Sequence, residues 1–277
     1  MEYLPKVSVI VPLFNDEKYI IECLQSVKNQ SYTNWECIIV NDGSTDNSES
    51  IVSDFIQNNT NFIYIKKENT GVSDTRNKGI MMSSGEFILP LDSDDKISPE
   101  YITEAITIFR KNPNTTLVYC KALFFGEKEG EFKLSRYKYS DLILKNMIFC
   151  SGIYKKQDYL KTQGYDINLK LGLEDWEFWI QLLDDKSEVV CLDKIHFYYR
   201  IKEKSRNTIH TDIKKIEEIQ DYIFNKHKNL YHDLLFDNKP KIDSLYELID
   251  KKNKFLALKK TFGYKISKIE REIKKIF

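Results

Sequence analysis

The sequence has few cysteines, and they are not spaced as a metal site or a disulfide framework would require. The five cysteines are Cys23, Cys37, Cys120, Cys150 and Cys191. No Cys-x-x-Cys pair occurs among them, whereas zinc sites and disulfide-rich folds need such paired spacings. The pattern therefore predicts free thiols in a reducing compartment.

Long apolar runs and an excess of one charge are also absent. No stretch approaches the ~20 apolar residues that span a bilayer, and the first six residues lack the basic region of a signal peptide. Lys plus Arg and Asp plus Glu both total 42, so there is no global signature of nucleic-acid binding. We expect a cytoplasmic protein, at most peripheral on the inner face of the cell membrane, that binds no nucleic acid.

Two glycine-rich nucleotide motifs are missing as well. The turn after the first apolar run contains no Gly-x-Gly-x-x-Gly, which disfavours a dinucleotide site of the Rossmann type. No Gly-x-x-x-x-Gly-Lys-Ser/Thr run occurs, which removes the phosphate-binding loop of P-loop enzymes.

What the first half of the sequence does contain is a regular alternation of strand and helix patterns. The expected strands are 7–11, 37–40, 62–65, 87–91 and 116–120, with a helical pattern between each pair. Their nearly continuous apolar character is typical of strands buried on both faces. The alternation predicts an α/β fold with a mostly parallel central sheet flanked by helices.

The alternation loosens after residue 121. The expected elements there are a loop or hairpin at 124–136, helices at 139–148, at 155–163 and from 173, and two strands at 189–192 and 195–199. From about residue 209 the chain is Lys-rich and helical. We therefore predict a main domain at 1–208, divided near residue 122 into halves 1–122 and 123–208, and a helical C-terminal extension at 209–277.

An acidic cluster follows the fourth expected strand, where Asp92, Asp94 and Asp95 stand within four residues. Burying such a cluster is costly without a positive partner, and Mg²⁺ and Mn²⁺ prefer carboxylate oxygens. Polar residues also follow the first strand at 12–17 and the second at 41–44. Since the carboxyl ends of parallel strands open on one edge, we expect a site there. A solvated acidic loop before a helix is the alternative.

Four motifs in this order resemble the inverting GT-A glycosyltransferases of family 2. They are VSVIVPLFN at 7–15, VNDGSTD at 40–46, GVSDTRNKG at 71–79 and LDSDD at 91–95. EDWEFW at 174–179 is similar to a later acidic motif of the family. The resemblance covers roughly residues 5–207. It implies a Rossmann-like GT-A catalytic domain at 1–208, with a nucleotide-sugar half at 1–122 and an acceptor half at 123–208.

The resemblance implies a role for particular residues in binding the nucleotide sugar. The implied set is Pro12, Phe14, Asn15, Glu17, Asp42, Arg76, Asp92, Ser93, Asp94 and Lys202. The first four would shape the pocket for base and ribose, and Asp92 would contact the ribose side. Asp42 would accept the uracil imide N–H, and Arg76 would reach the nucleotide or its phosphates. Asp94 would coordinate Mn²⁺ or Mg²⁺ bridging the diphosphate.

The resemblance also implies that Asp175 is the general base of a single displacement. The alternative is that Glu174, Asp175 and Glu177 merely complement the positive end of a helix. Glu174 and Trp176 are candidates for contact with the acceptor. Trp176 and Trp179, three residues apart, could instead be core anchors.

One position departs from the family pattern. Members commonly carry Tyr-Arg-x-His-x-x-Ser after the last strand, with the His as a metal ligand, whereas this chain has Lys202 in that place. A protonated lysine cannot ligate a metal, but it can pair with a diphosphate. Either metal dependence is weaker here, or Asp95 or water completes the metal shell.

The tail at 251–277 combines many lysines with an apolar stripe. The stripe residues, three or four apart, are Phe262, Ile266, Ile269, Ile273 and Phe277. Such a basic amphipathic helix could lie on anionic lipid. It could equally pack on the catalytic domain or on a second subunit in a homodimer.

Together these features predict an inverting hexosyltransferase that moves a sugar from a UDP-sugar to a hydroxyl of a glycan, either lipid-linked or a surface-polysaccharide precursor. A dTDP-sugar donor is one alternative, because thymine shares the imide N–H. The other is a catalytically silent subunit that binds nucleotide sugars or assists assembly, against which Asp94 and Asp175 argue.

Overall fold

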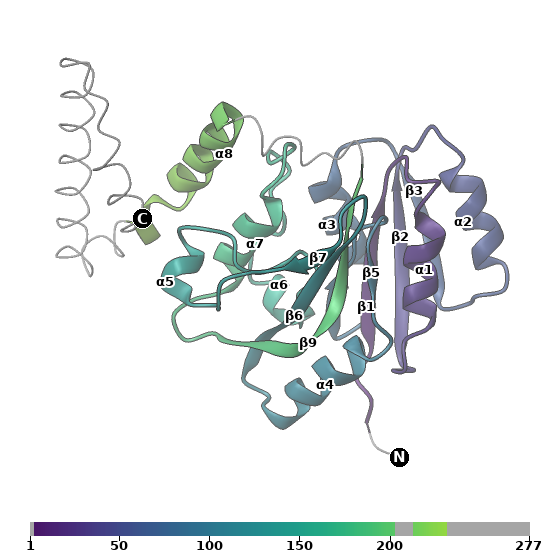
Figure 1. Ribbon diagram of the computed structural model, residues 1–277, viewed down its shortest axis with the longest axis horizontal. Coiled ribbons are helices and arrows are strands. Elements are labelled where there is room, and N and C mark those ends of the chain that lie inside the picture. Colours follow the sequence, from purple (N-terminus) through teal and green to yellow (C-terminus); the bar gives the residue numbers. More distant parts are fainter. Residues whose placement is uncertain (1–2, 203–212, 232–277) are drawn as a thin grey trace, which may run out of the picture. The chain divides into compact units, whose positions relative to one another are not determined.

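The computed structural model describes residues 3–202 and 213–231 (Figure 1). Its first half alternates strands and helices as predicted. The elements are β1 (Val7–Leu13), α1 (Ile20–Lys28), β2 (Trp35–Asp42), α2 (Ser48–Ile56), β3 (Phe62–Lys67), α3 (Val72–Met82), β4 (Phe87–Pro90), β5 (Lys96–Ile97), α4 (Tyr101–Lys111) and β6 (Thr115–Gly126). Each of the five predicted strands is therefore confirmed, and β5 is an addition.

The second half is less regular. It contains β7 (Gly130–Phe132), α5 (Tyr139–Leu142), β8 (Ile153–Lys155), α6 (Lys156–Tyr159), α7 (Glu174–Leu182), β9 (Glu188–Ile201) and α8 (Ile213–Lys226). The hairpin expected at 124–136 is formed by β6 and β7. The helices expected at 139–148 and 155–163 are only single turns, α5 and α6.

The two strands expected at 189–192 and 195–199 are in fact one. Strand β9 runs beside β6, pairing Leu192 with Cys120 and then Ile195 with Lys121. Between these pairs, Asp193 and Lys194 bulge out of the ladder. The sequence pattern predicts a break between two strands at this place. One of the two bulged residues, Asp193, pairs through its carboxylate with Lys121 Nζ at 2.5 Å. A bulge interrupts the register without ending a strand.

The described strands form one sheet in the order β3-β2-β1-β4-β8-β6-β9-β5, with β7 beside β6. Strands β3, β2, β1 and β4 pair in parallel. Because β8 is antiparallel to both β4 and β6, and β9 is parallel to β6, the two longest later strands share the direction of β1. Of the strands in the described residues, only β5, β7 and β8 run the other way. The predicted mostly parallel sheet is confirmed.

Alternate side chains of β1 build two buried layers, one on each face of the sheet. Val9 and Val11 join the apolar cluster that includes α1 and α4. Ile10 points to the other face, where α3 lies close enough that a Cβ added to Gly79 would meet Ile10 Cγ2 at 2.6 Å. The burial of both faces explains why β1 is apolar except at Ser8, whose hydroxyl donates to Glu36 Oε1 at 2.6 Å.

The described residues through Ile223 form one compact unit, and α8 extends beyond it. Among the described residues, no helix is both long and apolar enough to cross a bilayer. The domain boundary expected at 208 and the amphipathic tail expected at 251–277 lie outside the described residues.

The close approach of α3 to the sheet leads to a prediction for Gly79→Ala. The added methyl group would overlap Ile10 and approach Val40 Cγ2 at 3.2 Å. We expect the free energy of unfolding to fall by about 1–3 kcal/mol, as overpacking typically costs. Urea denaturation measures it. Lys78→Ala, at the exposed neighbouring position, is the control and should change stability by less than about 0.5 kcal/mol. Equal effects of both substitutions would contradict this packing.

Candidate active site

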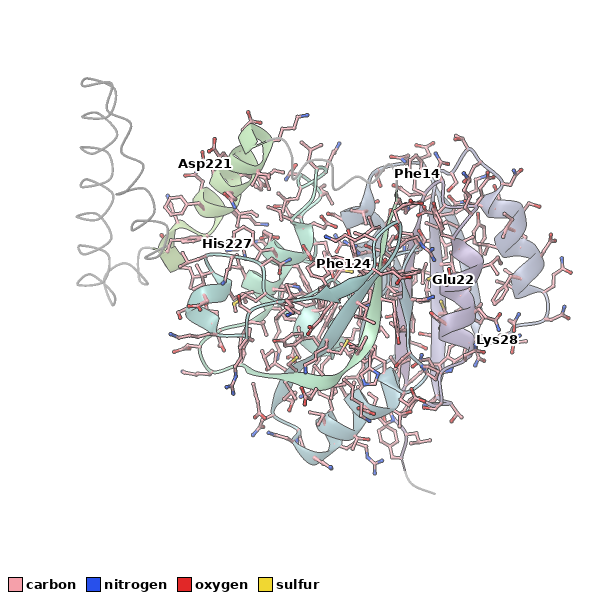
Figure 2. All side chains as sticks on the ribbon, viewed as in Figure 1. Phe14, Glu22, Lys28, Phe124, Asp221 and His227 are labelled. Atoms are coloured by element: carbon pink, nitrogen blue, oxygen red, sulfur yellow. The ribbon has the colours of Figure 1, made fainter. Side chains whose placement is uncertain are left out.

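The polar loops after β1, β2 and β4 meet at the carboxyl edge of the sheet and are tied to one another. Asn15, which has a positive φ of 53°, accepts a hydrogen bond from Thr45 N–H at 2.8 Å through Oδ1. Glu17 Oε2 accepts one from Asn47 N–H, also at 2.8 Å. These two predicted nucleotide ligands thus hold the loop after β2 in place. Phe14 lies at the end of β1, toward the top of the view in Figure 2, and is 46% exposed.

Asp42, at the end of β2, is buried, and both oxygens of its carboxylate accept hydrogen bonds from the protein. Its Oδ1 accepts a hydrogen bond from Thr70 N–H and its Oδ2 one from Gly71 N–H, both at 2.9 Å. Lys67 Nζ also pairs with Oδ1. The side chain therefore fixes the turn that leads into α3.

Arg76, in α3, joins two distant parts of the chain. Its side chain is 1% exposed, and its two terminal nitrogens lie 2.6 Å from Asp92 Oδ1 and 2.6 Å from Glu174 Oε1. Burial disfavours the guanidinium charge, but the two carboxylates outweigh that effect and raise the pKa of Arg76. Arg76 is predicted to reach the nucleotide or its phosphates. In this structure both of its terminal nitrogens are engaged in these ion pairs.

Asp94 is paired with the lysine that replaces the family's usual histidine. Lys202 Nζ lies 2.7 Å from Asp94 Oδ2 and 2.6 Å from Asp16 Oδ1. Burial alone would lower the pKa of Lys202, yet the Asp94 and Asp16 carboxylates raise it. Ser93 Oγ donates to the other oxygen of Asp16 at 2.5 Å. Asp16 is a site residue that the sequence motifs did not single out, although it lies between the candidates Asn15 and Glu17.

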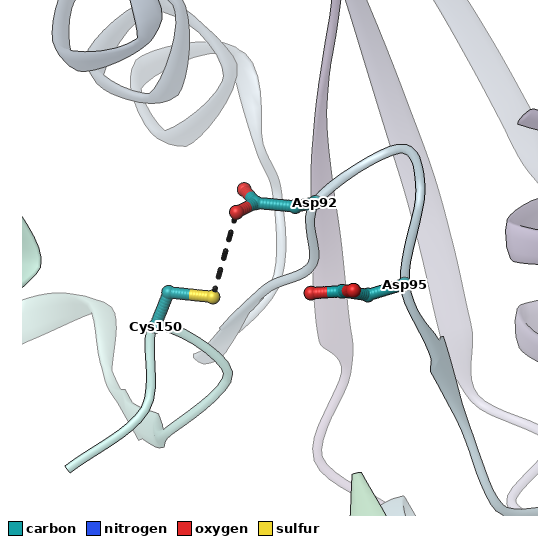
Figure 3. Close-up of side chains that lie close together, drawn as sticks. All are labelled: Asp92, Asp95 and Cys150. Carbon is teal, nitrogen blue, oxygen red and sulfur yellow. Dashed lines mark hydrogen bonds between the residues drawn. The ribbon is translucent and has the colours of Figure 1, made fainter. Parts of the chain in front are cut away.

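Asp95 is the most deeply buried of the three acids, at 1% exposed. Its Oδ1 accepts a hydrogen bond from Arg200 N–H at 2.8 Å, while Oδ2 has no hydrogen-bond partner among the described residues. Burial and the carboxylates of Asp94 and Asp92 raise its pKa well above the usual range. Near Asp95, Cys150 Sγ donates a weak hydrogen bond to Asp92 Oδ2 at 3.8 Å (Figure 3).

Asp175 is the second residue of α7, after Glu174, and its carboxylate accepts two hydrogen bonds. Trp176 N–H donates to its Oδ1 at 2.7 Å, and Asn146 Nδ2 donates to its Oδ2 at 3.0 Å. Burial and the Glu174 carboxylate raise the pKa of Asp175 to about 7, although Arg76 acts in the opposite direction. The preceding residue, Leu173, has a φ of 63°, an uncommon conformation for leucine that is often found at functional sites.

Trp176 is a core residue in this structure. Its side chain is 4% exposed, and its Nε1–H donates to Leu142 C=O at 2.6 Å. A stacking surface for a sugar needs an exposed ring face, so of the two roles left open by the sequence, the structure favours the core anchor. Trp179 is fully buried and bonds to Ile148 C=O at 3.2 Å.

The site thus brings together most of the acidic residues that the sequence singled out. Arg76 joins Asp92, the first acid of the cluster after β4, to Glu174, which precedes Asp175 in α7. Asp42, Asn15 and Glu17 bind neighbouring backbone. The excess of carboxylates over cations at this edge fits a cation held by Asp94. The buried Asp95 Oδ2 also lacks a hydrogen-bond partner among the described residues, which is costly without a positive group nearby.

Comparison with known proteins points to one family of enzymes. A family model described as "Glycosyl transferase family 2" matches residues 8–168. The minor teichoic acid biosynthesis protein GgaB of Bacillus subtilis (strain 168) is 31% identical over 215 residues, which are 74% of this chain and 24% of GgaB. Glycosyltransferase GlyA of Streptococcus pneumoniae serotype 4 is 30% identical over 229 residues, 75% of this chain and 32% of GlyA. The chain spans about a quarter to a third of the length of these relatives.

A solved structure gives the same picture of the fold. The crystal structure of residues 1–349 of S. aureus TarS in complex with UDP matches with a TM-score of 0.62 and 25% identity, over 71% of this chain and 61% of that one. Together with the sheet topology, this likeness confirms the predicted GT-A fold.

The buried position of Arg76 predicts a large cost for Arg76→Met. The substitution leaves Asp92 and Glu174 without their shared cation, and breaking a buried ion pair typically costs about 3–5 kcal/mol. Urea denaturation at neutral pH measures the free energy of unfolding. Lys161→Met removes a pair of similar length, 2.6 Å, on the surface and should cost under about 1 kcal/mol. A loss for Arg76→Met no larger than that of the control would show that the two carboxylates do not depend on Arg76.

Proposed function

The chain belongs to glycosyltransferase family 2, and we propose that it moves a sugar from a UDP-sugar to a hydroxyl of a glycan with inversion. The UDP seen with TarS supports the choice of nucleotide. The role of GgaB in minor teichoic acid biosynthesis supports a surface-polymer precursor as the acceptor. Such a precursor would be met at the cytoplasmic face of the membrane.

One observation carries the proposal: the Arg76 guanidinium lies between Asp92, the first residue of the acidic cluster, and Glu174, which precedes Asp175. A proposed cation site and a proposed base are thereby fixed in one place, where a donor diphosphate and an acceptor hydroxyl could meet. The proposed donor-binding residues are Pro12, Phe14, Asn15, Glu17, Asp42, Arg76, Asp92, Ser93, Asp94 and Lys202.

Asp175 is the proposed base. As the acceptor oxygen forms its bond to the anomeric carbon, its proton passes to the Asp175 carboxylate. The bond between that carbon and the diphosphate oxygen breaks, and UDP leaves with the electron pair. A pKa of about 7 suits this role, because a general base works best when its pKa lies near the operating pH. The hydrogen bonds from Trp176 and Asn146 hold the carboxylate in one orientation.

Stabilisation of the leaving group is the second requirement. A divalent cation held by Asp94 would neutralise charge on the departing diphosphate. Lys202, already 2.7 Å from Asp94, is a second positive group for the same purpose. We propose that Lys202 can turn from its carboxylate partners to the diphosphate, so that part of the nucleotide affinity does not require metal.

The proposed base is tested by Asp175→Asn, with UDP release from UDP-sugars as the measurement. We expect kcat to fall by about 10²–10⁴-fold, the usual contribution of a general base, because an amide cannot accept the proton. UDP binding, followed by thermal shift, should persist. Asp193→Asn, at an exposed position, is the matched control and should keep full turnover.

The wild-type pH profile adds a second readout. Since Asp175 must be deprotonated to act, kcat/KM should rise with pH through about 7, the pKa of Asp175, and then level off. Undiminished turnover in Asp175→Asn would refute the base assignment. If only dTDP-sugars release their nucleotide, the proposed UDP-sugar donor is replaced by a dTDP-sugar. If none of the nucleotide sugars is turned over, the result favours the catalytically silent subunit.

The proposed role of Lys202 is tested by thermal shifts with UDP, with Mn²⁺ present or with EDTA. Wild-type protein should be stabilised by UDP in both conditions, and more strongly with Mn²⁺. Lys202→Gln should lose the shift in EDTA and keep it with Mn²⁺, because the metal remains as the only counter-charge. Lys133→Gln, an exposed lysine, should behave as the wild type. A Lys202→Gln shift in EDTA equal to that of the wild type would contradict the proposal.

A further inference from the structure

Cys150 is a buried thiol in a loop whose position is fixed from several sides. Tyr101 Oη donates to the carbonyl of the next residue, Ser151, at 2.7 Å. Trp179 Nε1 donates to Ile148 C=O at 3.2 Å, and Phe149 packs against Phe197 with ring centroids 5.3 Å apart. The loop therefore presents the Cys150 sulfur in a defined place, and the proposed transfer reaction gives that sulfur no task.

Two carboxylates face this sulfur. One donor atom each from Asp92, Asp95 and Cys150 lies within 4.8 Å of the other two. Figure 3 shows the Asp95 carboxylate directed toward the side on which Cys150 and Asp92 lie. Asp95 is 1% exposed, and its Oδ2 finds no hydrogen-bond partner in the described part of the chain. A buried carboxylate oxygen without a partner is costly, and a cation would satisfy it.

We propose that Asp92, Asp95 and Cys150 form a mixed oxygen–sulfur site for a thiophilic divalent cation such as Zn²⁺ or Cd²⁺. Soft thiolate ligands select such ions, whereas Mg²⁺ prefers oxygen ligands only. Three protein ligands leave a position for water, as in open zinc sites. The Cys150 thiol gives its proton to solvent as the sulfur–metal bond forms. Asp92, whose side chain is 24% exposed, offers the route from solvent.

This site is separate from the cation proposed at Asp94, where the carboxylate already has Lys202 as a counter-charge. It is also independent of the proposed transfer reaction, because metal binding can be measured without any sugar donor. Failure of one proposal therefore leaves the other standing.

The test is a titration of the untagged full chain with Cd²⁺, followed by the ultraviolet charge-transfer absorbance of thiolate–Cd²⁺ bonds. The titration uses the Cys191→Ser background, because Cys191 is exposed and could bind the ion at the surface. We expect one Cd²⁺ per chain, with Zn²⁺ competing and Mg²⁺ not competing. Cys150→Ser should lose the band.

Two further variants keep the test decisive. Cys23→Ser removes another buried thiol, one that donates to the Asp92 backbone carbonyl rather than to its carboxylate, and should keep the band. Asp95→Asn preserves shape and should weaken Cd²⁺ binding while circular dichroism confirms the fold. No band in the Cys191→Ser chain, or a band that survives Cys150→Ser, would overturn the proposal.

Discussion

The site depends on one buried positive side chain, the guanidinium of Arg76. Arg76 is fixed by α3 against the sheet, and its two ion pairs reach the loop after β4 on one side and the start of α7 on the other. Taking a guanidinium out of water is unfavourable unless both carboxylates are in place. The two ion pairs therefore depend on each other. If either Asp92 or Glu174 is out of place, the buried guanidinium loses one of its two counter-charges. Asp175 owes its environment to the same contact, because it follows Glu174 directly in α7.

Neighbouring carboxylates at this edge differ in character because their partners differ. Asp92 shares Arg76 with Glu174, and Asp94 shares Lys202 with Asp16. Asp95 has a backbone N–H on one oxygen and, among the described residues, no hydrogen-bond partner on the other. Asp175 has two neutral donors and a carboxylate neighbour, which leaves its pKa near neutrality. Environment thus gives acids of the same type different partners and different pKa values, and the proposed roles of cation ligand and proton acceptor rest on that difference.

The first half of the fold was predictable because its strands are buried on both faces and so read as apolar runs separated by helical patterns. The second half was not: β8 is three residues long, α5 and α6 are single turns, and a bulge at Asp193 makes one strand look like two. In the site, the acidic motifs singled out Asp94 and Asp175 as candidates, but charge alone could not show that Arg76 and Lys202 pair with carboxylates. Cys150 and Asn146 carry no sequence signal at all, since only tertiary packing brings their loop to the acids.

Arg200, near the end of β9, and Lys202, just after that strand, have a consequence for how the molecule is made. Lys202 contacts Asp16 across 186 positions of sequence, and Arg200 contacts Glu22 across 178. Contacts this distant in sequence form late, because a long loop must close before they are gained. During synthesis the strands β1 to β4 can pair well before these cations leave the ribosome. Until then Asp16 and Glu22 lack these partners, so we expect the part of the site that depends on Lys202 and Arg200 to be completed late in folding.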